Sequence, residues 1–319
     1  MILIAPDKFK GTYTSQEMCR LMSDAVRHIS PETEIVCRPL SDGGEGFSAL
    51  KAFIPEFRDY ALLESSAIVG HGSYPPDMPL MLRSSYALGA AVHPGVPTII
   101  SVGGTGVSDG GAGFLQALGV RFYDRCGRMI TEPLSPATIP AIASADISCL
   151  ADYNLTGVID VRATLTGPGL SALDFARQKA IAGEDLSGLK HALSHLQKIL
   201  GGESEFDGAG GGMGYALASV ASARCTSGAQ LAVSLLDPIL DSGQVDLVIT
   251  GEGCVDHQTT AGGKLPDAVY RAASARSIPT LIVGGRIDVP DAYPLMCTLN
   301  ELPQKLREKS FTELLRHGS

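Results

Sequence analysis

The sequence lacks the features that would place it in a membrane, on nucleic acid or outside the cell. No apolar run approaches the ~18 residues needed to cross a bilayer, and the opening MILIAPDKFK is too poor in apolar residues for a signal-peptide core. No block of five or more like charges occurs, and the net charge is −9. We therefore expect a cytoplasmic globular protein with neither nucleic acid nor membrane as a partner.

Paired cysteine motifs are also absent. The seven cysteines are scattered and odd in number, and no CxxC pair occurs among them. This pattern argues against a disulfide framework or a zinc ribbon. We expect reduced, mostly structural thiols.

The best-known nucleotide-binding motifs are missing as well. The sequence has no GxxxxGK[ST] string, no HRD and DFG pair, and no GxGxxG after its first strand. These absences exclude a P-loop enzyme and a protein kinase, and they disfavour hydride transfer. An oxidoreductase that binds NAD(P) through other glycine loops stays open as a rival.

Both ends of the chain show alternating strand and helix patterns. Residues 2–5 predict a short strand, and Thr14-x-x-Glu17 predicts a capping box that opens an amphipathic helix. A second strand is expected at residues 34–40 and a short helix at 47–53. The chain therefore begins as a β-loop-α-β unit.

The C-terminal part repeats this pattern, and two further strands are expected in the middle. Residues 245–250 predict a buried strand that ends in GEG, a helix follows with Pro266 in its first turn, and 280–283 predict another strand. The middle strands are 98–102 and 158–161. Strands that alternate with helices predict largely parallel sheets.

These patterns predict an α/β fold with two domains. Residues 1–62 and about 235–319 would form a Rossmann/flavodoxin-like parallel-sheet domain built from both chain ends. Residues from about 63 to 234 would form an inserted second α/β domain, with the active site in the cleft between the two. The helix-like stretches 213–223 and 229–240 fit either domain.

Glycine is unusually frequent, with 37 residues, and it gathers in five loops, most of which also carry an acid or a lysine. These loops are residues 4–11, 41–46, 102–113, 208–214 and 249–264. Glycine lets the backbone turn its N–H groups toward a phosphate, and a following helix adds its positive end. One such loop is more often a tight turn that needs glycine for steric reasons. Five of them favour a phosphate-handling protein.

The charged residues on these loops suit phosphoryl transfer. That reaction needs Mg²⁺, positive groups around the phosphoryl oxygens, and an acid that orients or deprotonates the attacking hydroxyl. The candidate carboxylates are Asp7, Asp42, Glu45, Asp109, Glu252 and Asp256, and the candidate cations are Lys8, Lys10 and Lys264. Each single carboxylate fits a helix cap or a turn equally well.

Histidines give weaker signals. His191 and His195 have the i, i+4 spacing of a metal pair, but no glutamate lies between them, and an exposed helix face is the favoured interpretation. His257 could orient a substrate, although a hydrogen-bonded loop histidine is favoured.

At five segments the sequence resembles the type-1 glycerate kinase family. The segments are IAPDKFKGT, DGGEG at 42–46, SDGGAGFLQALG at 108–119, GAGGGMGYAL at 208–217 and DLVITGEGCVDHQT at 246–259. They occur in the family's order and extend from the first strand toward residue 285. The resemblance implies a two-domain α/β kinase that uses MgATP and D-glycerate to make 2- or 3-phosphoglycerate.

We combine the resemblance with the loop chemistry to predict the site. The predicted catalytic residues are Asp42, Asp256, Lys10 and Lys264. The predicted substrate- or phosphate-binding residues are Asp7, Lys8, Gly43, Gly44, Gly103, Gly104, Thr105, Gly210, Gly211, Gly212 and Glu252. Asp109 and Glu45 are the predicted metal ligands. A homodimer and the identity of the phosphorylated hydroxyl are left open.

The middle of the chain departs from the family pattern. Members usually carry Asn-Pro after the Asp-Val of this region, where this chain has Ala163 and Thr164. They also carry Gly-Pro before a Gln-Lys, where this chain has Ala176 and Arg177. A non-catalytic or altered-substrate paralogue that binds glycerate or nucleotide is therefore the alternative.

Overall fold

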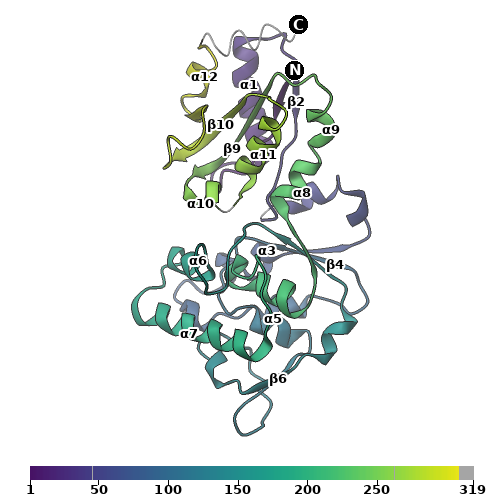
Figure 1. The fold of residues 1–319 in the computed structure, drawn as a ribbon, viewed down its shortest axis with the longest axis vertical. Helices are drawn as coiled ribbons and strands as arrows, with labels where there is room; N and C mark the ends of the chain where they lie inside the picture. Colours follow the sequence, from purple (N-terminus) through teal and green to yellow (C-terminus); the bar gives the residue numbers. More distant parts are fainter. Residues whose placement is uncertain (45, 262, 309–319) are drawn as a thin grey trace. The chain divides into compact units, whose positions relative to one another are not determined.

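The computed structural model describes residues 1–44, 46–261 and 263–308 (Figure 1). The chain divides into two compact units, each built from separated stretches of sequence. Unit 1 contains residues 1–42, 49–54 and those from 228 onward, and unit 2 contains residues 43–48 and 55–227.

The bounds of the units differ in detail from the expected ones. Strand β3 (Ala61–Glu64) pairs with β4 (Thr98–Val102), so the chain has already entered the second sheet before residue 62. Strand β8 (Arg224–Ser227) is still paired within that sheet, and the division follows directly after it.

The described residues of unit 1 contain a sheet of five parallel strands in the order β11, β10, β9, β1, β2. The strands are β1 (Ile2–Ile4), β2 (Ile35–Cys37), β9 (Leu247–Val255), β10 (Thr280–Ile287) and β11 (Met296–Thr298). The first strand lies between β2 and β9, so both chain ends build one sheet. The expected α/β class with a parallel sheet is confirmed.

Helices cover this sheet through apolar faces. They are α1 (Ser15–Ile29), α8 (Gly228–Ser234), α9 (Asp237–Leu240), α10 (His257–Ala261), α11 (Leu265–Ser274) and α12 (Leu302–Lys305), and the short α2 (Phe47–Lys51) straddles the division between the units. The predicted capping box opens α1: the Thr14 hydroxyl accepts from the Glu17 N–H at 3.2 Å, and the Glu17 carboxylate accepts from the Thr14 N–H at 2.8 Å. Met22 of α1 and Leu302 of α12 share one buried cluster with Ile4 of the sheet.

Strand β9 is longer than the sequence suggested. We expected the strand to end at Thr250 and GEG to form a loop, but pairing with β10 continues to Val255. Gly251 permits this, because a Cβ there would lie 2.0 Å from the carbonyl oxygen of Val283. Glu252 therefore lies on a strand, where pairing with Gly284 of β10 fixes its backbone.

The described residues of unit 2 contain a second parallel sheet, in the order β3, β4, β7, β8, where β7 is Leu155–Ile159. Its helices are α3 (Ser65–Val69), α4 (Tyr86–Ala90), α5 (Ala112–Ala117), α6 (Ala172–Gln178) and α7 (Gly183–Leu200). An antiparallel pair, β5 (Arg121–Tyr123) with β6 (Ser144–Asp146), lies beside them. The expected helix at 213–223 is a π-helical stretch, Tyr215–Val220.

The core of unit 2 joins the sheet to its helices. Ile100 and Ile159 of the sheet share one buried cluster with Phe114 of α5 and with Leu193 and Leu196 of α7. No helix among the described residues has both the length and the hydropathy to cross a membrane. All seven cysteines are free thiols, as expected.

The histidine pair on α7 lies only in part on the exposed helix face that was expected, because His195 is half-buried. The rings of His191 and His195 stack with centroids 6.3 Å apart, and His191 is exposed. Nε2 of His195 lies 2.7 Å from the carbonyl oxygen of Ile142. The described residues show no third metal-ligating side chain that joins the pair in a metal site.

Candidate active site

The first candidate site lies in unit 1, where the chain leaves β1 and β2. Asp7 follows β1, and its N–H donates to the carbonyl oxygen of Gly251 at 2.9 Å, so it is held against β9. Lys8 Nζ lies 3.6 Å from Asp7 Oδ1 and 3.4 Å from Asp42 Oδ1. One ammonium thus bridges carboxylates that follow neighbouring parallel strands.

Asp7 is the most perturbed acid of this site. Its side chain is buried, and burial together with the negative charge of Asp42 raises its pKa from 3.8 to about 8. Lys8 opposes the shift, while Glu252 adds a weaker repulsion. The structure therefore gathers more negative charge at this sheet edge than a single lysine neutralises.

Glu252 forms the second part of the site. Its Oε1 accepts from the Thr259 hydroxyl at 2.7 Å, and its Oε2 lies 3.7 Å from Lys264 Nζ. Burial raises the pKa of Glu252, and the charge of Lys264 and the Thr259 hydrogen bond oppose the rise. Lys264 stands at the N-cap position of α11, directly before the helix.

Asp256 and His257 lie between Glu252 and Lys264 in the chain. Asp256 Oδ1 accepts from the backbone N–H of Gln258 at 2.8 Å and of Thr259 at 3.3 Å, so the carboxylate caps the start of α10. The charge of Asp256 still raises the pKa of Glu252, which places both acids in one electrostatic neighbourhood. His257 has an exposed side chain, and its carbonyl oxygen accepts from Thr260.

The loop that carries Lys10 crosses over β9. A Cβ on Gly253 would lie 3.1 Å from the backbone nitrogen of Lys10, so the second glycine of GEG leaves room for this loop. Lys10 itself is exposed.

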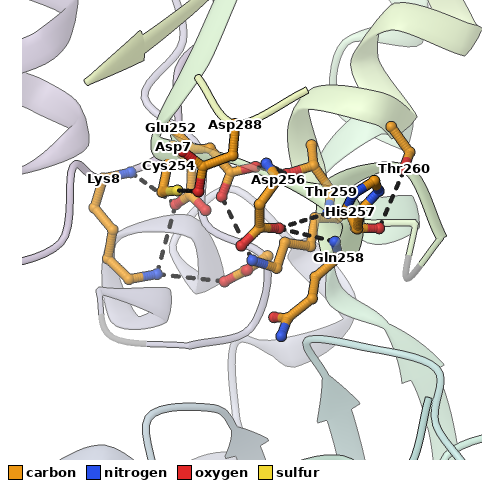
Figure 2. Close-up of polar contacts among 12 residues, drawn as sticks. Asp7, Lys8, Glu252, Cys254, Asp256, His257, Gln258, Thr259, Thr260 and Asp288 are labelled. Atoms are coloured by element: carbon orange, nitrogen blue, oxygen red, sulfur yellow. Dashed lines mark hydrogen bonds and ion pairs between the residues drawn. The ribbon is translucent and has the colours of Figure 1, made fainter. Parts of the chain in front are cut away.

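Figure 2 shows Asp7, Glu252 and Asp256 gathered at this end of the strands, with Lys8 reaching in beside them. The sequence-predicted residues Asp7, Lys8, Asp42, Glu252, Asp256 and Lys264 are therefore brought together. Loops at the carboxyl ends of parallel strands are the usual ligand site of such sheets. Alternating acids and lysines there can accept a proton and offset phosphate charge.

The second candidate site is a glycine loop of unit 2 that follows β4. The Ser65 hydroxyl donates to the carbonyl oxygen of Gly103 at 3.2 Å and accepts from its N–H at 3.3 Å. The N–H of Gly106 donates to Val69 at 2.7 Å. Gly104 has a φ of +67°, in the left-handed region that favours glycine. Helix α3 thus holds the loop that contains Thr105.

Gly43 and Gly44 pack against the same loop. A Cβ on Gly103 would lie 2.7 Å from the Cα of Gly44 and 3.0 Å from Oδ2 of Asp160. A Cβ on Gly43, whose φ is +98°, would lie 3.0 Å from Val158 Cγ1. The glycines predicted from the sequence therefore meet Asp160 at the carboxyl ends of β4 and β7.

The glycine loop at 208–214 packs closely against its surroundings. Gly211 and Gly212 are buried with φ of +70° and +96°, and a Cβ on Gly211 would lie 2.1 Å from the carbonyl oxygen of Val107. The N–H of Gly110 donates to Gly211 at 3.1 Å. We expected this loop to cradle phosphates, and the structure shows that all three glycines also pack closely on the loop at 102–110; a Cβ on the half-buried Gly210 would lie 2.5 Å from Cγ1 of Val102.

Of the two residues predicted to bind metal, Asp109 is placed inside the second unit. Asp109 is fully buried, and its oxygens accept from the N–H and hydroxyl of Ser85 and from the N–H groups of Gly111 and Gly113. It anchors the loop onto α4 and α5, and burial raises its pKa. Glu45 lies outside the described residues. Within the described ranges no three His, Cys, Asp or Glu side chains are placed to hold a metal ion.

Three residues at these sites escaped the sequence analysis. Asp160 was missed because the sequence placed it inside a strand expected at residues 158–161. The strand itself runs from residue 155 to 159, earlier than expected, so Asp160 lies just beyond its end. Ser65 gave no local signal, because its partner Gly103 is distant in the chain. Lys179 belongs to the Gln-Lys pair noted in the sequence, but its contacts with Thr105 and Val107 are distant in the chain and could not be predicted.

Acids, lysines and glycine loops at the ends of parallel strands define an α/β phosphotransferase. The chain matches the model of the glycerate kinase family over residues 2–58 and 48–297, and it belongs to that family. Membership of a kinase family argues against the alternative of an oxidoreductase that binds NAD(P).

Individual relatives agree with the family assignment. The chain is 30% identical over 327 residues to a glycerate kinase of Bacillus subtilis (strain 168), with 90% of this chain and 85% of that protein covered. It is 31% identical to a glycerate kinase of Haemophilus influenzae, with 96% and 94% covered. It is 27% identical to a glycerate 2-kinase of Escherichia coli (strain K12), with 90% and 85% covered.

The fold agrees with a solved structure. A crystal structure assigned as glycerate kinase 2 of Salmonella typhimurium LT2 superposes with a TM-score of 0.68 and 25% sequence identity. The alignment covers 99% of this chain and 97% of the other.

Proposed function

We propose that this protein is a cytoplasmic glycerate kinase that transfers the γ-phosphoryl group of MgATP to a hydroxyl of D-glycerate. The product would be 2- or 3-phosphoglycerate. The observation that carries the proposal is the acid and lysine cluster of unit 1, in which Asp7, Lys8 and Asp42 follow β1 and β2 and Glu252 on β9 pairs with Lys264. The family of the chain supplies the reaction class.

In the proposed mechanism Asp42 orients the glycerate hydroxyl and accepts its proton. The hydroxyl oxygen then forms a bond to the γ-phosphorus, the bond from that phosphorus to the β,γ-bridging oxygen breaks, and ADP leaves with the electron pair. Lys264 and Lys10 offset the charge that spreads over the phosphoryl oxygens. Lys8 keeps the carboxylate of Asp42 in place through the 3.4 Å contact.

The cluster suits a Mg²⁺ ion that is bound jointly by protein carboxylates and by the phosphates of ATP, rather than one that is enclosed by protein ligands alone. The ion commonly takes only one or two carboxylates and completes its shell with phosphate oxygens and water. Asp7 and Glu252 would hold it, because both are buried acids whose pKa values are raised and which repel one another. When bound, Mg²⁺ would offset the negative charge of the phosphates.

The glycine loop of unit 2 would bind the phosphates of ATP. Gly103, Gly104 and Thr105 can approach a phosphate closely through their backbone N–H groups. Ser65 fixes the first of these glycines on both its N–H and its carbonyl side.

The test is ADP release by the purified protein with MgATP, with and without D-glycerate, followed by ³¹P and ¹³C NMR of the product. We expect glycerate-dependent ADP release that stops when EDTA removes Mg²⁺. NMR then assigns the phosphate to the 2- or the 3-oxygen. Absence of turnover with D-glycerate under conditions where MgATP binds would refute the proposal.

The departures at residues 163–164 favour one alternative, a paralogue that binds without catalysis or uses another hydroxy acid. In the structure the carbonyl oxygen of Ala163 accepts from the N–H of Gly208 at 2.7 Å, and the N–H of Thr164 donates to the carbonyl oxygen of Leu170 at 2.9 Å. These residues thus support the packed glycine loop at 208–214. A thermal shift by D-glycerate without turnover would favour the alternative, because binding alone stabilises the fold.

A further inference from the structure

Lys179 lies beside the glycine loop of unit 2, although it is far from that loop in the sequence. It follows α6, and its Nζ donates to the carbonyl oxygen of Val107. The same Nζ lies 3.4 Å from Oγ1 of Thr105 and 3.4 Å from Oγ of Ser108. One half-buried ammonium therefore holds three oxygens of a four-residue stretch.

A second basic side chain holds the glycine loop of unit 2 through a backbone carbonyl group. Nη1 of Arg83 donates to the carbonyl oxygen of Gly106 at 3.3 Å, next to the carbonyl that Lys179 binds. Across the part of the chain that the structure describes, the backbone N–H groups of Gly104 and Thr105 form no hydrogen bond. Basic side chains thus take the carbonyl oxygens, and two adjacent N–H donors are left for a ligand. Successive N–H donors near a left-handed glycine are a common anion-binding arrangement.

We propose that Lys179 is a positioning residue of the nucleotide site. It holds Thr105 to Ser108 in the conformation that presents the N–H groups of Gly104 and Thr105 to the phosphates of ATP. Its positive charge also lies 3.4 Å from Oγ1 of Thr105, in the same loop, which strengthens binding of an anion there. This role presupposes the proposed function, in which the loop binds ATP.

The proposed role requires a side chain at position 179 that is both long and positively charged. The ammonium must reach three oxygens at once, so a neutral side chain of similar length loses both the contacts and the charge. An arginine keeps the charge but has a planar donor set, so it restores the contacts only in part. A residue that only filled space would be replaced equally well by methionine.

The experiment compares the full-length variants Lys179→Met and Lys179→Arg with wild type. Lys190→Met is the matched control, because Lys190 is an exposed lysine on α7 of the same unit. The primary readout is the dissociation constant for MgADP from titration calorimetry, which needs no turnover. The second readout is KM for ATP against KM for D-glycerate, together with the melting temperature of each free variant.

We expect Lys179→Met to raise the dissociation constant for MgADP and the KM for ATP at least about tenfold, with a smaller change in the KM for D-glycerate. Lys179→Arg should recover part of the loss, and Lys190→Met should match wild type. If Lys179→Met does not fold, Lys179→Gln replaces it, because glutamine keeps amide donors without the charge. MgADP affinity equal to wild type in the folded neutral variant would overturn the role.

Failure of the proposed function would give a different result. A wild-type protein that binds MgADP but phosphorylates no glycerate refutes the kinase activity and leaves the Lys179 comparison decisive. A wild-type protein that binds no MgADP overturns both.

Discussion

Nζ of Lys264 lies 3.7 Å from Oε2 of Glu252, so a cation at the start of α11 is paired with an acid on β9. The pair is largely buried, with side-chain exposures of 22% and 11%. Its partial burial strengthens the attraction and ties the position of Lys264 to the sheet.

Replacing Lys264 should therefore impair turnover more than folding. We expect Lys264→Met to lower kcat by about 10²- to 10³-fold, because a cation beside the transferring phosphoryl is lost. Lys264→Arg should retain part of the activity. Steady-state kinetics would measure both, with Lys190→Met as the control, and a kcat for Lys264→Met within a factor of three of wild type would contradict the role.

The two candidate acids can be separated by amide substitution. We expect Asp42→Asn to lower kcat by about 10²- to 10⁴-fold with little loss of stability, because Asn cannot accept the hydroxyl proton. Asp256→Asn should also lower turnover, while its amide oxygen can still accept from the N–H of Gln258. Asp24→Asn on the exposed face of α1 is the control. Wild-type turnover in both Asp42→Asn and Asp256→Asn would refute their assigned roles.

Asp7 should make stability depend on pH in a defined direction. Its pKa is about 8 in the native protein and near 3.8 in the unfolded chain, so the native state keeps a proton that the unfolded chain releases between those values. The free energy of unfolding should therefore fall as pH rises from 4 to 8, and this contribution should level off above the native pKa.

Asp7→Asn removes that contribution. We expect the variant to gain stability relative to wild type as pH is raised from 5 to 8.5, which urea denaturation at the two values would measure. An identical pH dependence in both proteins would show that Asp7 is ionised in the native state.

The glycine loop at 208–214 should be intolerant of side chains. At Gly211 a Cβ would lie 2.1 Å from the carbonyl oxygen of Val107 and the φ of +70° disfavours alanine, so Gly211→Ala should cost about 2–5 kcal/mol. Gly243 is the matched control, because its φ is +71° but nothing lies within 4 Å of its Cβ position. Gly243→Ala should cost only about 1 kcal/mol. If urea denaturation shows equal losses in the free energy of unfolding for the two variants, the close approach of Val107 does not contribute to the cost.

Local sequence signals predicted the individual elements well where the signal depends on neighbouring residues. The capping box at Thr14 and the strand at residues 98–102 formed as expected, because a cap and an apolar strand are defined within a few residues. The acids at 7, 42 and 252 could be nominated because each lies in a glycine-containing segment that follows an expected strand. Their assembly follows from parallel pairing of β1 with β2 and β9, which carries their carboxyl ends to one edge.

The sequence by itself determined the α/β class, the family and the glycine-rich loops, because these depend on periodicity and on short ordered motifs. The tertiary structure decided what each loop does. GEG became part of a strand because β10 pairs along it, Asp109 became a buried anchor because Ser85 and two glycine N–H groups surround it, and Lys179 reached Thr105 only through folding. Contacts between residues distant in the chain leave no local pattern, so only the packed fold distinguishes a glycine that binds from one that makes room.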